Sequence, residues 1–410
     1  MINSKNQASF NRRQFLKAVT AATATYAMSP WLSGCGGGSR RPDVVKIGVL
    51  LPFSDIYAVL GESITEGMKM YFDQVGNEAG GRKIELITED TEIKPDVAQQ
   101  KARKLIEQDE VDFVTGVVSS GVLISLRDYL IETKKLLICS NAGANELSRQ
   151  LKTPYIWRTS FTNWMMHWPI GGWVANNVGR QAYLSVPDYA AGQNALSAFT
   201  NNFEANGGQI VGVQRTPFPN MGDPAPFIAE LAQAAPDLIY AWYSGSSAVT
   251  FIKAYYEFGL SNKIPLVTSG FTVGEDVRPA EGEAALGIRN SLHWTPRLDN
   301  PENKAFLEAF QTRAGKQPDV YHVQGYDTAR VIVDMLDTVE GDTTNVDKLI
   351  EVLAGISFAS PRGPFALDAH SQAPRQNMYL LEVREVEGAL QNVVLESLGE
   401  IVDPGDDSQG

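Results

Sequence analysis

The chain has 410 residues and a formal net charge of −13 at pH 7, with 48 acidic and 35 basic residues. This length exceeds what one ordinary hydrophobic core serves and fits two domains. The acidic balance argues against a nucleic-acid partner, because a phosphate backbone must be neutralised by Lys and Arg.

The first 34 residues have the features of an export signal. Arg12 and Arg13 precede a weakly apolar run, residues 18–32, that is interrupted by Pro30. A spanning helix needs about 20 strongly apolar residues, so we do not expect a stable transmembrane segment. A basic start, a short apolar middle and a small-residue end are typical of a signal peptide. The order NRRQFLK is similar to a twin-arginine export signal.

The letters LSGC, ending at Cys35, resemble a lipobox, where a signal peptidase cuts before an acylated cysteine. We therefore expect residues 1–34 to be removed, Cys35 to carry the lipid, and residues 35–43 to form a flexible tether. The protein would then be exported to the periplasm or cell surface and anchored to a membrane. The alternative is an amphipathic N-terminal helix with an incidental cysteine. Cys139, in the apolar run LLICS, is expected to be a small buried residue.

From residue 44 onward, strand-like runs alternate with helix-like spacing. A first series of strands is VVKIGVLLPF, RKIELITED, DFVTGVV and KLLICS, and a second is RQAYLSV, QIVGVQRTPF, PDLIYAWY and KIPLVTSGF. Strands that alternate with helices imply parallel sheets with right-handed crossovers. The sequence thus predicts an α/β protein with two doubly wound lobes. A helix pair follows within residues 300–355, then a hairpin over residues 363–383.

Motifs for cofactor chemistry are missing. The first strand ends in LLPFSDIYAVLG, without the GxGxxG turn of a dinucleotide site, and the sequence has no GxxxxGK[ST], HExxH or GxSxG. Its four histidines are scattered and do not have the spacing of metal ligands. We therefore expect no cofactor, no metal and no enzymatic activity. A hydrolase built on Ser119 or Ser120 remains an alternative, and it would need a histidine close by in space.

Four loops at strand ends are candidate ligand contacts, because doubly wound sheets bind ligands beyond the carboxyl ends of their strands. Ser119 and Ser120 open a helix, whose free N–H groups favour an anion; simple capping by serine is the alternative. The other candidates are Asn141, Ala142 and Gly143 in the first lobe, and Tyr189, Trp242 and Ser247 in the second. Each aromatic taken alone could equally be core packing.

Over residues 44–402 the chain resembles a type I periplasmic substrate-binding protein of the leucine/isoleucine/valine-binding family, which serves ABC importers. The resemblance is carried in order by IGVLLPFSDIYAVLGESITEGMKMYFDQVGNEAGGRKIEL, VTGVVSSG, ICSNAGANELS, DYAAGQ and HVQGYDTARVIVDML. It implies two lobes joined by three crossovers around a ligand cleft, with permease subunits as partners. Lobe 1 would comprise residues 44–160 and 280–355, and lobe 2 residues 161–279 and 356–402. Composition predicts a disordered tail over residues 403–410.

The resemblance also implies ligand contacts and a ligand class. Carried over by position, the contacts fall on Tyr57, Leu60, Ser120, Asn141, Ala142, Gly143, Tyr189, Ser247 and Phe271. Where amino-acid-binding members use a threonine and an acidic residue for the α-ammonium group, this chain has Gly143 and Ser247. The resemblance therefore favours a small organic acid without that group, most plausibly an aromatic carboxylate. Leucine, isoleucine or valine binding, and a ligand-sensing receptor or regulator with the same fold, are the alternatives.

Overall fold

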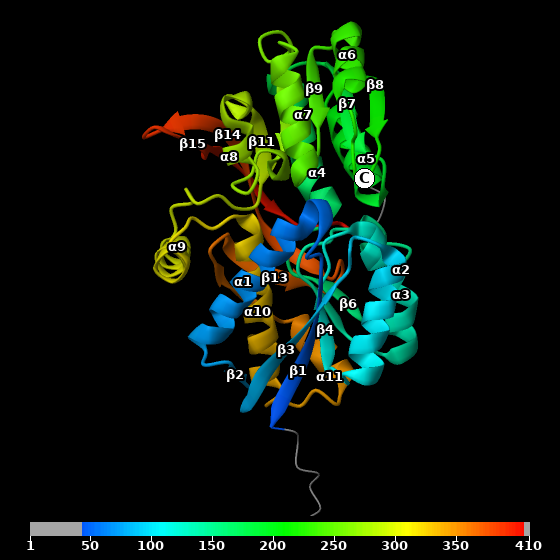
Figure 1. Ribbon diagram of the computed structural model, residues 1–410, viewed down its shortest axis with the longest axis vertical. Coiled ribbons are helices and arrows are strands. Elements are labelled where there is room, and N and C mark those ends of the chain that lie inside the picture. The colour runs from blue at the N-terminus through cyan, green and yellow to red at the C-terminus, as the bar shows by residue number, and fades with distance from the viewer. Residues whose placement is uncertain (1–42, 406–410) are drawn as a thin grey trace, which may run out of the picture. The chain divides into compact units, whose positions relative to one another are not determined.

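The computed structural model describes residues 43–405, so the predicted signal peptide, Cys35 and the tether up to residue 42 lie outside the described residues. Two β-sheets, each covered by helices, make up the described chain (Figure 1). The predicted α/β fold is confirmed. No helix within residues 43–405 combines the length and the apolar character needed to cross a bilayer.

The first sheet has the strand order β2-β3-β1-β4-β5-β6. Strand β1 lies between β3 and β4 and is parallel to both. Its residues are almost all buried, as expected for a strand covered on both faces. The bounds are β1 Val44–Leu51, β2 Glu78–Ala79, β3 Arg82–Asp90, β4 Phe113–Gly116, β5 Leu137–Cys139 and β6 Ile156–Arg158, with helices α1 Ala58–Gln74, α2 Pro95–Arg103 and α3 Ser120–Thr133.

The second sheet has nine strands in the order β12-β13-β14-β11-β10-β9-β7-β8, with β15 paired to β14. Strands β7 to β11 are parallel to their neighbours within that series, whereas β14 pairs antiparallel with β11, β13 and β15. The strands are β7 Gln181–Pro187, β8 Gln209–Thr216, β9 Leu238–Ala241, β10 Leu266–Ser269, β11 Arg289–Leu292, β12 Ser357–Ser360, β13 Gly363–Asp368, β14 Ala373–Val386 and β15 Ala389–Ile401. The hairpin predicted for residues 363–383 is confirmed by the β13–β14 pair.

Helices α4 to α8 lie between β6 and β11 in sequence, and α9 to α11 lie between β11 and β12. Their bounds are α4 Asn163–Asn177, α5 Ala190–Ala205, α6 Ala225–Ala234, α7 Ser246–Glu257, α8 Arg278–Glu281, α9 Pro301–Ala314, α10 Val320–Thr338 and α11 Val346–Leu353. Helix α10 packs against α1 of the first sheet at two glycines. A Cβ on Gly67 would lie 2.0 Å from the carbonyl oxygen of His322, and one on Gly325 would lie 2.0 Å from that of Ile64. Only glycine permits this close crossing.

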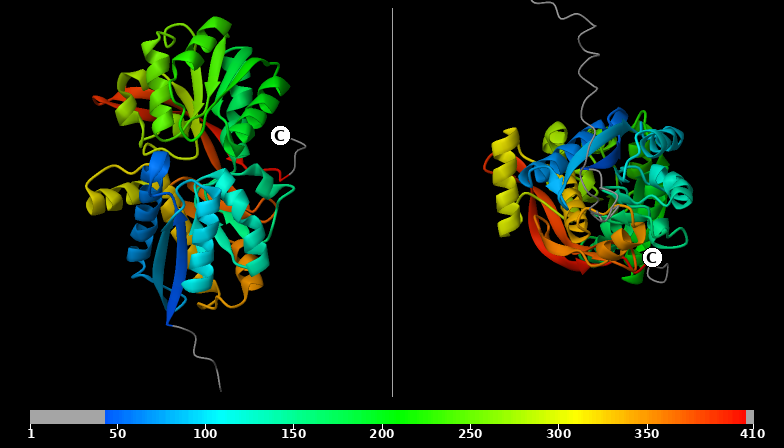
Figure 2. Two further views of the ribbon diagram at one scale, coloured as in Figure 1. Left: turned by 45° about the vertical axis from the view of Figure 1, so that its right-hand side comes forward. Right: turned by 90° about the horizontal axis from the view of Figure 1, so that it is seen from below.

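The last strands of the second sheet reach into the neighbourhood of the first sheet (Figure 2). Phe365 and Leu367 of β13 belong to the second sheet, yet they pack in the same apolar core as Val45 and Ile332. The lobe boundaries proposed from sequence stay a prediction, because β13 contributes to both.

Residues 403–410 were predicted to be a disordered tail, and this prediction is wrong for Asp403, which is buried. Its carboxylate accepts a hydrogen bond from Thr162 Oγ1 at 2.6 Å and lies 3.4 Å from Arg149 Nη2. Thr162 is in turn the N-cap of α4, so the end of the chain is tied to a helix start. Residues 406–410 of the predicted tail lie outside the described residues.

Cys139 is fully buried at the end of β5, as its apolar context predicted. Its sulfur lies 3.5 Å from the carbonyl oxygen of Ala142, and burial raises the pKa of the thiol to about 12. It is therefore an inert core residue.

Candidate ligand-binding cleft

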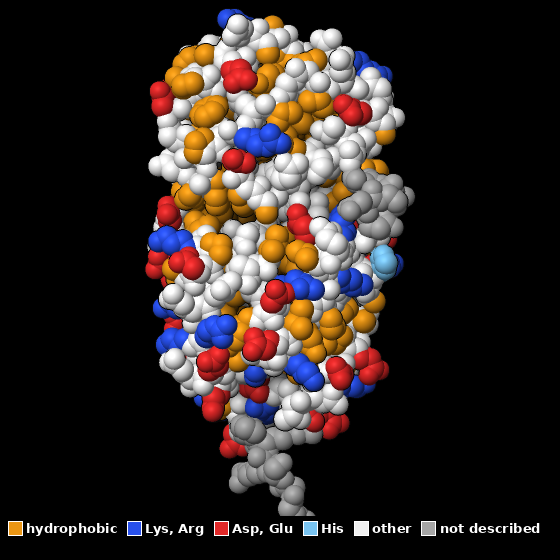
Figure 3. Space-filling view, turned by 90° about the vertical axis from the view of Figure 1, so that its right-hand side faces the viewer, with side chains coloured by type: hydrophobic (Ala, Val, Ile, Leu, Met, Phe, Trp, Pro, Cys, Tyr) orange, Lys and Arg blue, Asp and Glu red, His pale blue; other side chains and the backbone are white. Residues whose placement is uncertain are grey.

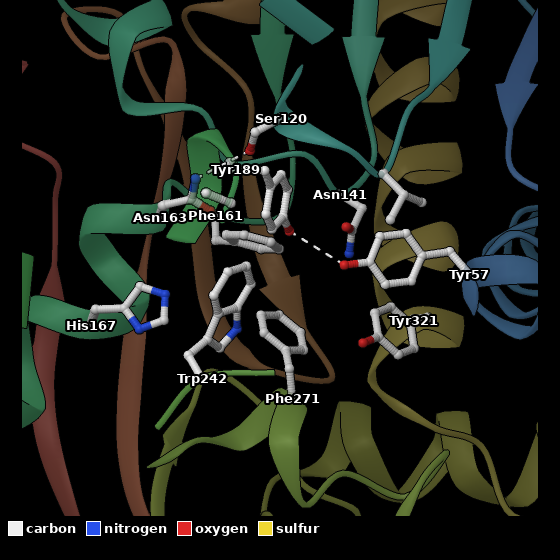
Figure 4. Close-up of a pocket in the computed structure, with 13 residues that line it drawn as sticks. Tyr57, Ser120, Asn141, Phe161, Asn163, His167, Tyr189, Trp242, Phe271 and Tyr321 are labelled. Atoms are coloured by element: carbon white, nitrogen blue, oxygen red, sulfur yellow. Dashed lines mark hydrogen bonds between the residues drawn. The ribbon is translucent and has the colours of Figure 1, made fainter. Parts of the chain in front are cut away.

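A small cavity of about 30 Å³ lies where loops from the two sheets meet (Figure 4). Most of its lining residues come within about five residues after the end of a strand, which is where doubly wound sheets bind ligands; we call this the strand-end rule. The lining residues are Tyr57, Val118, Ser120, Asn141, Gly143, Phe161, Asn163, His167, Tyr189, Ala191, Trp242, Phe271 and Tyr321. Six of these thirteen residues are Phe, Tyr or Trp, so we call this the aromatic cleft.

Ser120 provides the anion-binding feature of the cleft. It is the first residue of α3, four residues after the end of β4. The N–H groups of a helix's first turn have no partner within the helix, and the helix dipole adds partial positive charge there. The Ser120 hydroxyl accepts a hydrogen bond of 3.2 Å from Asn163 Nδ2. It can therefore turn its own proton toward a ligand oxygen.

Position 143, in the loop after β5, has room only for glycine. A Cβ at this position would lie 2.6 Å from the Phe161 ring and 2.7 Å from Asn163 Oδ1. A threonine here would collide with both side chains. On the same loop, Asn141 Nδ2 donates to Gln324 Oε1 at 2.6 Å, which fixes the amide in the wall of the cleft.

Three hydroxyl groups meet on another side of the aromatic cleft. The hydroxyl oxygens of Tyr57 and Tyr189 are 3.3 Å apart, and Ser244 Oγ donates to the Tyr57 oxygen at 2.9 Å. Tyr57 follows the first sheet's β1, whereas Tyr189 and Ser244 follow strands of the second. Burial raises the pKa of both tyrosines, so both are neutral at physiological pH. This contact joins the two lobes.

The remaining wall consists of stacked rings. Phe161 and Phe271 have ring centroids 5.1 Å apart, and Phe271 stacks on Tyr321 at 5.8 Å. Tyr189 stacks on Trp242 at 5.8 Å with an interplanar angle of 23°. Such surfaces favour a flat apolar ligand that can stack or pack edge-on.

The aromatic cleft contains no charged side chain at neutral pH. Its lining includes no Asp, Glu, Lys or Arg. His167 Nδ1 lies 2.6 Å from the Tyr240 hydroxyl, and burial lowers the pKa of this histidine to about 3. An anion in the cleft would therefore be held by neutral donors and by the start of α3. Within residues 43–405 no group of three or more His, Cys, Asp or Glu side chains could hold a metal ion.

Seven of the residues proposed from sequence come together in the cleft: Tyr57, Ser120, Asn141, Gly143, Tyr189, Trp242 and Phe271. Four others do not line it. Leu60 and Ala142 are buried in apolar cores, and Ser119 is the buried N-cap of α3. Ser247 lies on α7, where its hydroxyl donates to the Pro219 carbonyl at 3.4 Å. These four lie outside the lining of the aromatic cleft, and their contact with a ligand stays a prediction.

Sequence reasoning missed six lining residues: Val118, Phe161, Asn163, His167, Ala191 and Tyr321. Phe161 and Asn163 follow β6, a three-residue strand too short to produce a recognisable pattern. The strand-end rule would have found them had this strand been seen. Tyr321 is the second residue of α10, whose N-cap Asp319 makes a capping box with His322. That helix-start signal was present in the sequence.

Comparison with known proteins identifies the class. The family model for periplasmic binding proteins matches residues 44–389. A Leu/Ile/Val-binding protein homolog of Brucella melitensis is 31% identical over 371 residues, which is 88% of this chain and 94% of that protein. The chain therefore belongs to the type I periplasmic binding proteins of the Leu/Ile/Val-binding family, as predicted. These are substrate-binding proteins of ABC transporters rather than enzymes, which implies a periplasmic location and permease partners.

Two solved structures of similar proteins contain aromatic acids. A solute-binding protein of R. palustris in complex with benzoate is 35% identical, with a TM-score of 0.83 over 88% of this chain and 99% of that one. A solute-binding protein of Rhodopseudomonas palustris BisB5 in complex with 3,4-dihydroxybenzoic acid is 30% identical, with a TM-score of 0.84 over 89% and 99%.

Proposed function

We propose that this protein captures a small aromatic carboxylate and delivers it to the permease of an ABC importer. The carrying observation is the pairing, in one cleft, of a helix start at Ser120 with walls of stacked aromatic rings and no charged side chain. The benzoate and dihydroxybenzoate complexes of the two R. palustris proteins support this ligand class.

The same cleft is a poor site for an amino acid. An α-ammonium group without a counter-charge costs several kcal/mol in a closed, poorly hydrated site. Gly143 lacks the hydroxyl that amino-acid-binding members supply, and Ser247 points to Pro219. Asp188, the acidic residue next to Tyr189, is exposed and does not line the cleft. An acid without the amino group avoids this cost.

A ligand panel tests the proposal. Purified protein is examined by thermal shift and calorimetry with benzoate, cyclohexanecarboxylate, benzamide, leucine, isoleucine and valine. Benzoate is expected to give the largest shift in Tm. Benzamide lacks the negative charge that the start of α3 would bind, and cyclohexanecarboxylate lacks the flat ring that the aromatic walls would stack on. A ligand at about 100 times its Kd stabilises the fold by about 2.7 kcal/mol, which a thermal shift resolves. A larger shift with leucine, isoleucine or valine would overturn the proposal.

We also propose that a lipid on Cys35 anchors the protein to a membrane. The support is the LSGC sequence behind the twin-arginine start. Membrane fractionation of the wild type and of Cys35→Ser tests it, with mass spectrometry of the mature N-terminus. An unacylated, freely soluble wild type would contradict the anchor without touching the ligand proposal.

The surface is compatible with an exported binding protein. On the face shown in Figure 3, acidic and basic side chains alternate with apolar ones and do not gather into a basic patch.

A further inference from the structure

One buried side-chain nitrogen of the aromatic cleft has no hydrogen-bond partner. Trp242 is only 6% exposed, and its indole Nε1 is buried without a hydrogen-bond acceptor. Among the residues that line the cleft, no other side chain has a buried nitrogen or oxygen without a partner. An indole N–H can only donate. A buried donor left unpaired costs about 1–3 kcal/mol, so an acceptor supplied by the ligand would remove a real penalty.

The position of this donor is fixed by its surroundings. Trp242 directly follows β9, and its backbone N–H donates to the Ser185 carbonyl at 3.1 Å. The indole ring stacks on Tyr189 and meets the His167 ring edge to face at 5.4 Å. These contacts leave the ring little freedom to turn its nitrogen toward another acceptor.

Besides Asn141 and the hydroxyls of Tyr57, Tyr189 and Tyr321, the cleft has polar groups at two ends on either side of Phe161. Ser120 and Asn163 form one, which we call the serine end; His167 and Trp242 form the other, the tryptophan end. In Figure 4 the Phe161 ring lies between the two ends, and the indole nitrogen is on the side of Trp242 that faces Phe271. A flat acid whose carboxylate sits at the serine end and whose ring packs on Phe161 therefore extends toward Trp242.

We infer that the ligand carries an uncharged oxygen on the ring position remote from its carboxylate, and that Trp242 Nε1 donates a hydrogen bond to that oxygen. The inference rests on the proposed function and narrows it to aromatic hydroxy acids. It makes Trp242 a specificity-determining residue of the cleft.

The oxygen is uncharged because the tryptophan end has no cation. Burial lowers the pKa of His167 and keeps it neutral, and the lining contains no Lys or Arg. A second carboxylate there would be a buried charge without a counter-ion, which costs several kcal/mol. A phenolic hydroxyl accepts the indole proton without that cost.

Calorimetry with a positional series on the wild-type protein tests the inference. The ligands are benzoate, 2-hydroxybenzoate, 4-hydroxybenzoate and terephthalate. One hydrogen bond contributes about 1 kcal/mol, so 4-hydroxybenzoate should bind roughly 5-fold more tightly than benzoate. 2-Hydroxybenzoate should gain nothing, because its hydroxyl lies beside the carboxylate. Terephthalate should bind at least about 100-fold more weakly than 4-hydroxybenzoate.

Trp242→Phe then deletes the donor and keeps a ring. It should abolish the preference for 4-hydroxybenzoate while changing benzoate affinity less than about 3-fold. The matched control is Trp173→Phe, because Trp173 lies outside the cleft and its indole donates to Glu396 at 2.5 Å. The control should keep the preference.

The outcomes separate the two proposals. The inference is overturned if the wild type binds benzoate as tightly as it binds 4-hydroxybenzoate, or if the preference for 4-hydroxybenzoate survives in Trp242→Phe. Either result leaves the proposed function standing. A water molecule that accepts the hydrogen bond from Trp242 Nε1 would make the two affinities equal. Failure of every aromatic acid, with binding of leucine, overturns the proposed function itself. If Trp242→Phe does not fold, the positional series on the wild type still decides.

Discussion

Asn194 offers the sharpest test of how the lobes close on a ligand. It lies on α5, is 6% exposed and does not line the aromatic cleft. Its Oδ1 accepts hydrogen bonds from the Asn145 backbone N–H at 3.0 Å and from Asn163 Nδ2 at 2.9 Å. Its Nδ2 donates to Glu146 Oε1 at 3.0 Å. Asn145 and Glu146 belong to the predicted lobe 1, whereas Asn163 belongs, like Asn194, to the predicted lobe 2 and also bonds to Ser120 at the serine end.

Two lobes connected by a few chain segments are expected to move relative to each other, and to close on the ligand. If the two bonds to Asn145 and Glu146 form only in the closed state, Asn194→Ala removes them from that state alone, whereas the bond to Asn163 is lost in both states. Each of the two contributes about 0.5–1.5 kcal/mol net. In an open state these two partners would face water and bond to it, so no unpaired group is added there. A total of about 1–3 kcal/mol corresponds to a Kd raised roughly 5- to 150-fold.

Surface plasmon resonance with the best aromatic acid measures the effect, which should lie mainly in the dissociation rate. Small-angle scattering at saturating ligand reports whether closure still occurs. Asn202→Ala is the control, because Asn202 lies on the same helix but donates to the Trp168 carbonyl at 2.6 Å. A wild-type dissociation rate in Asn194→Ala would refute the reasoning. So would an equal loss of stability in the ligand-free protein, since the bonds would then exist in the open state too.

Three further predictions concern single residues. Ser120→Ala should weaken binding by roughly 1–2 kcal/mol, the usual loss for a hydrogen bond to a charged group; unchanged affinity by calorimetry would mean that the serine is only structural. Glu281 is buried with both carboxylate oxygens unpartnered, and burial raises its pKa to about 9 from 4.5. The folded chain thus keeps a proton that the unfolded chain releases, so wild-type stability should fall as the pH rises from 4.5 to 9. Glu281→Gln should flatten that fall in Tm; parallel profiles would contradict it. Cys139 should resist thiol reagents until denaturant is added, because burial raises its pKa to about 12; rapid labelling of the native protein would disprove this.

The sequence by itself determined the α/β fold and half of the cleft. The apolar run VVKIGVLL became β1, Val44–Leu51, because a strand covered on both faces has no polar side to present. Ser120, Asn141, Tyr189 and Trp242 could be found because the carboxyl ends of parallel strands converge on one edge. That rule needs only the position of a residue along its strand.

Only the tertiary structure decided which side chains face the ligand. Leu60 and Ser247 both follow strand ends in sequence. Packing directs the Leu60 side chain into an apolar core and the Ser247 hydroxyl toward Pro219. Phe161 and His167 line the cleft from a segment with no periodic pattern of its own. The direction of a side chain on a short helix or loop depends on contacts with residues far away in the chain. The unpartnered state of Trp242 Nε1 is likewise fixed by what the fold places around it, since a sequence cannot show the absence of an acceptor in space.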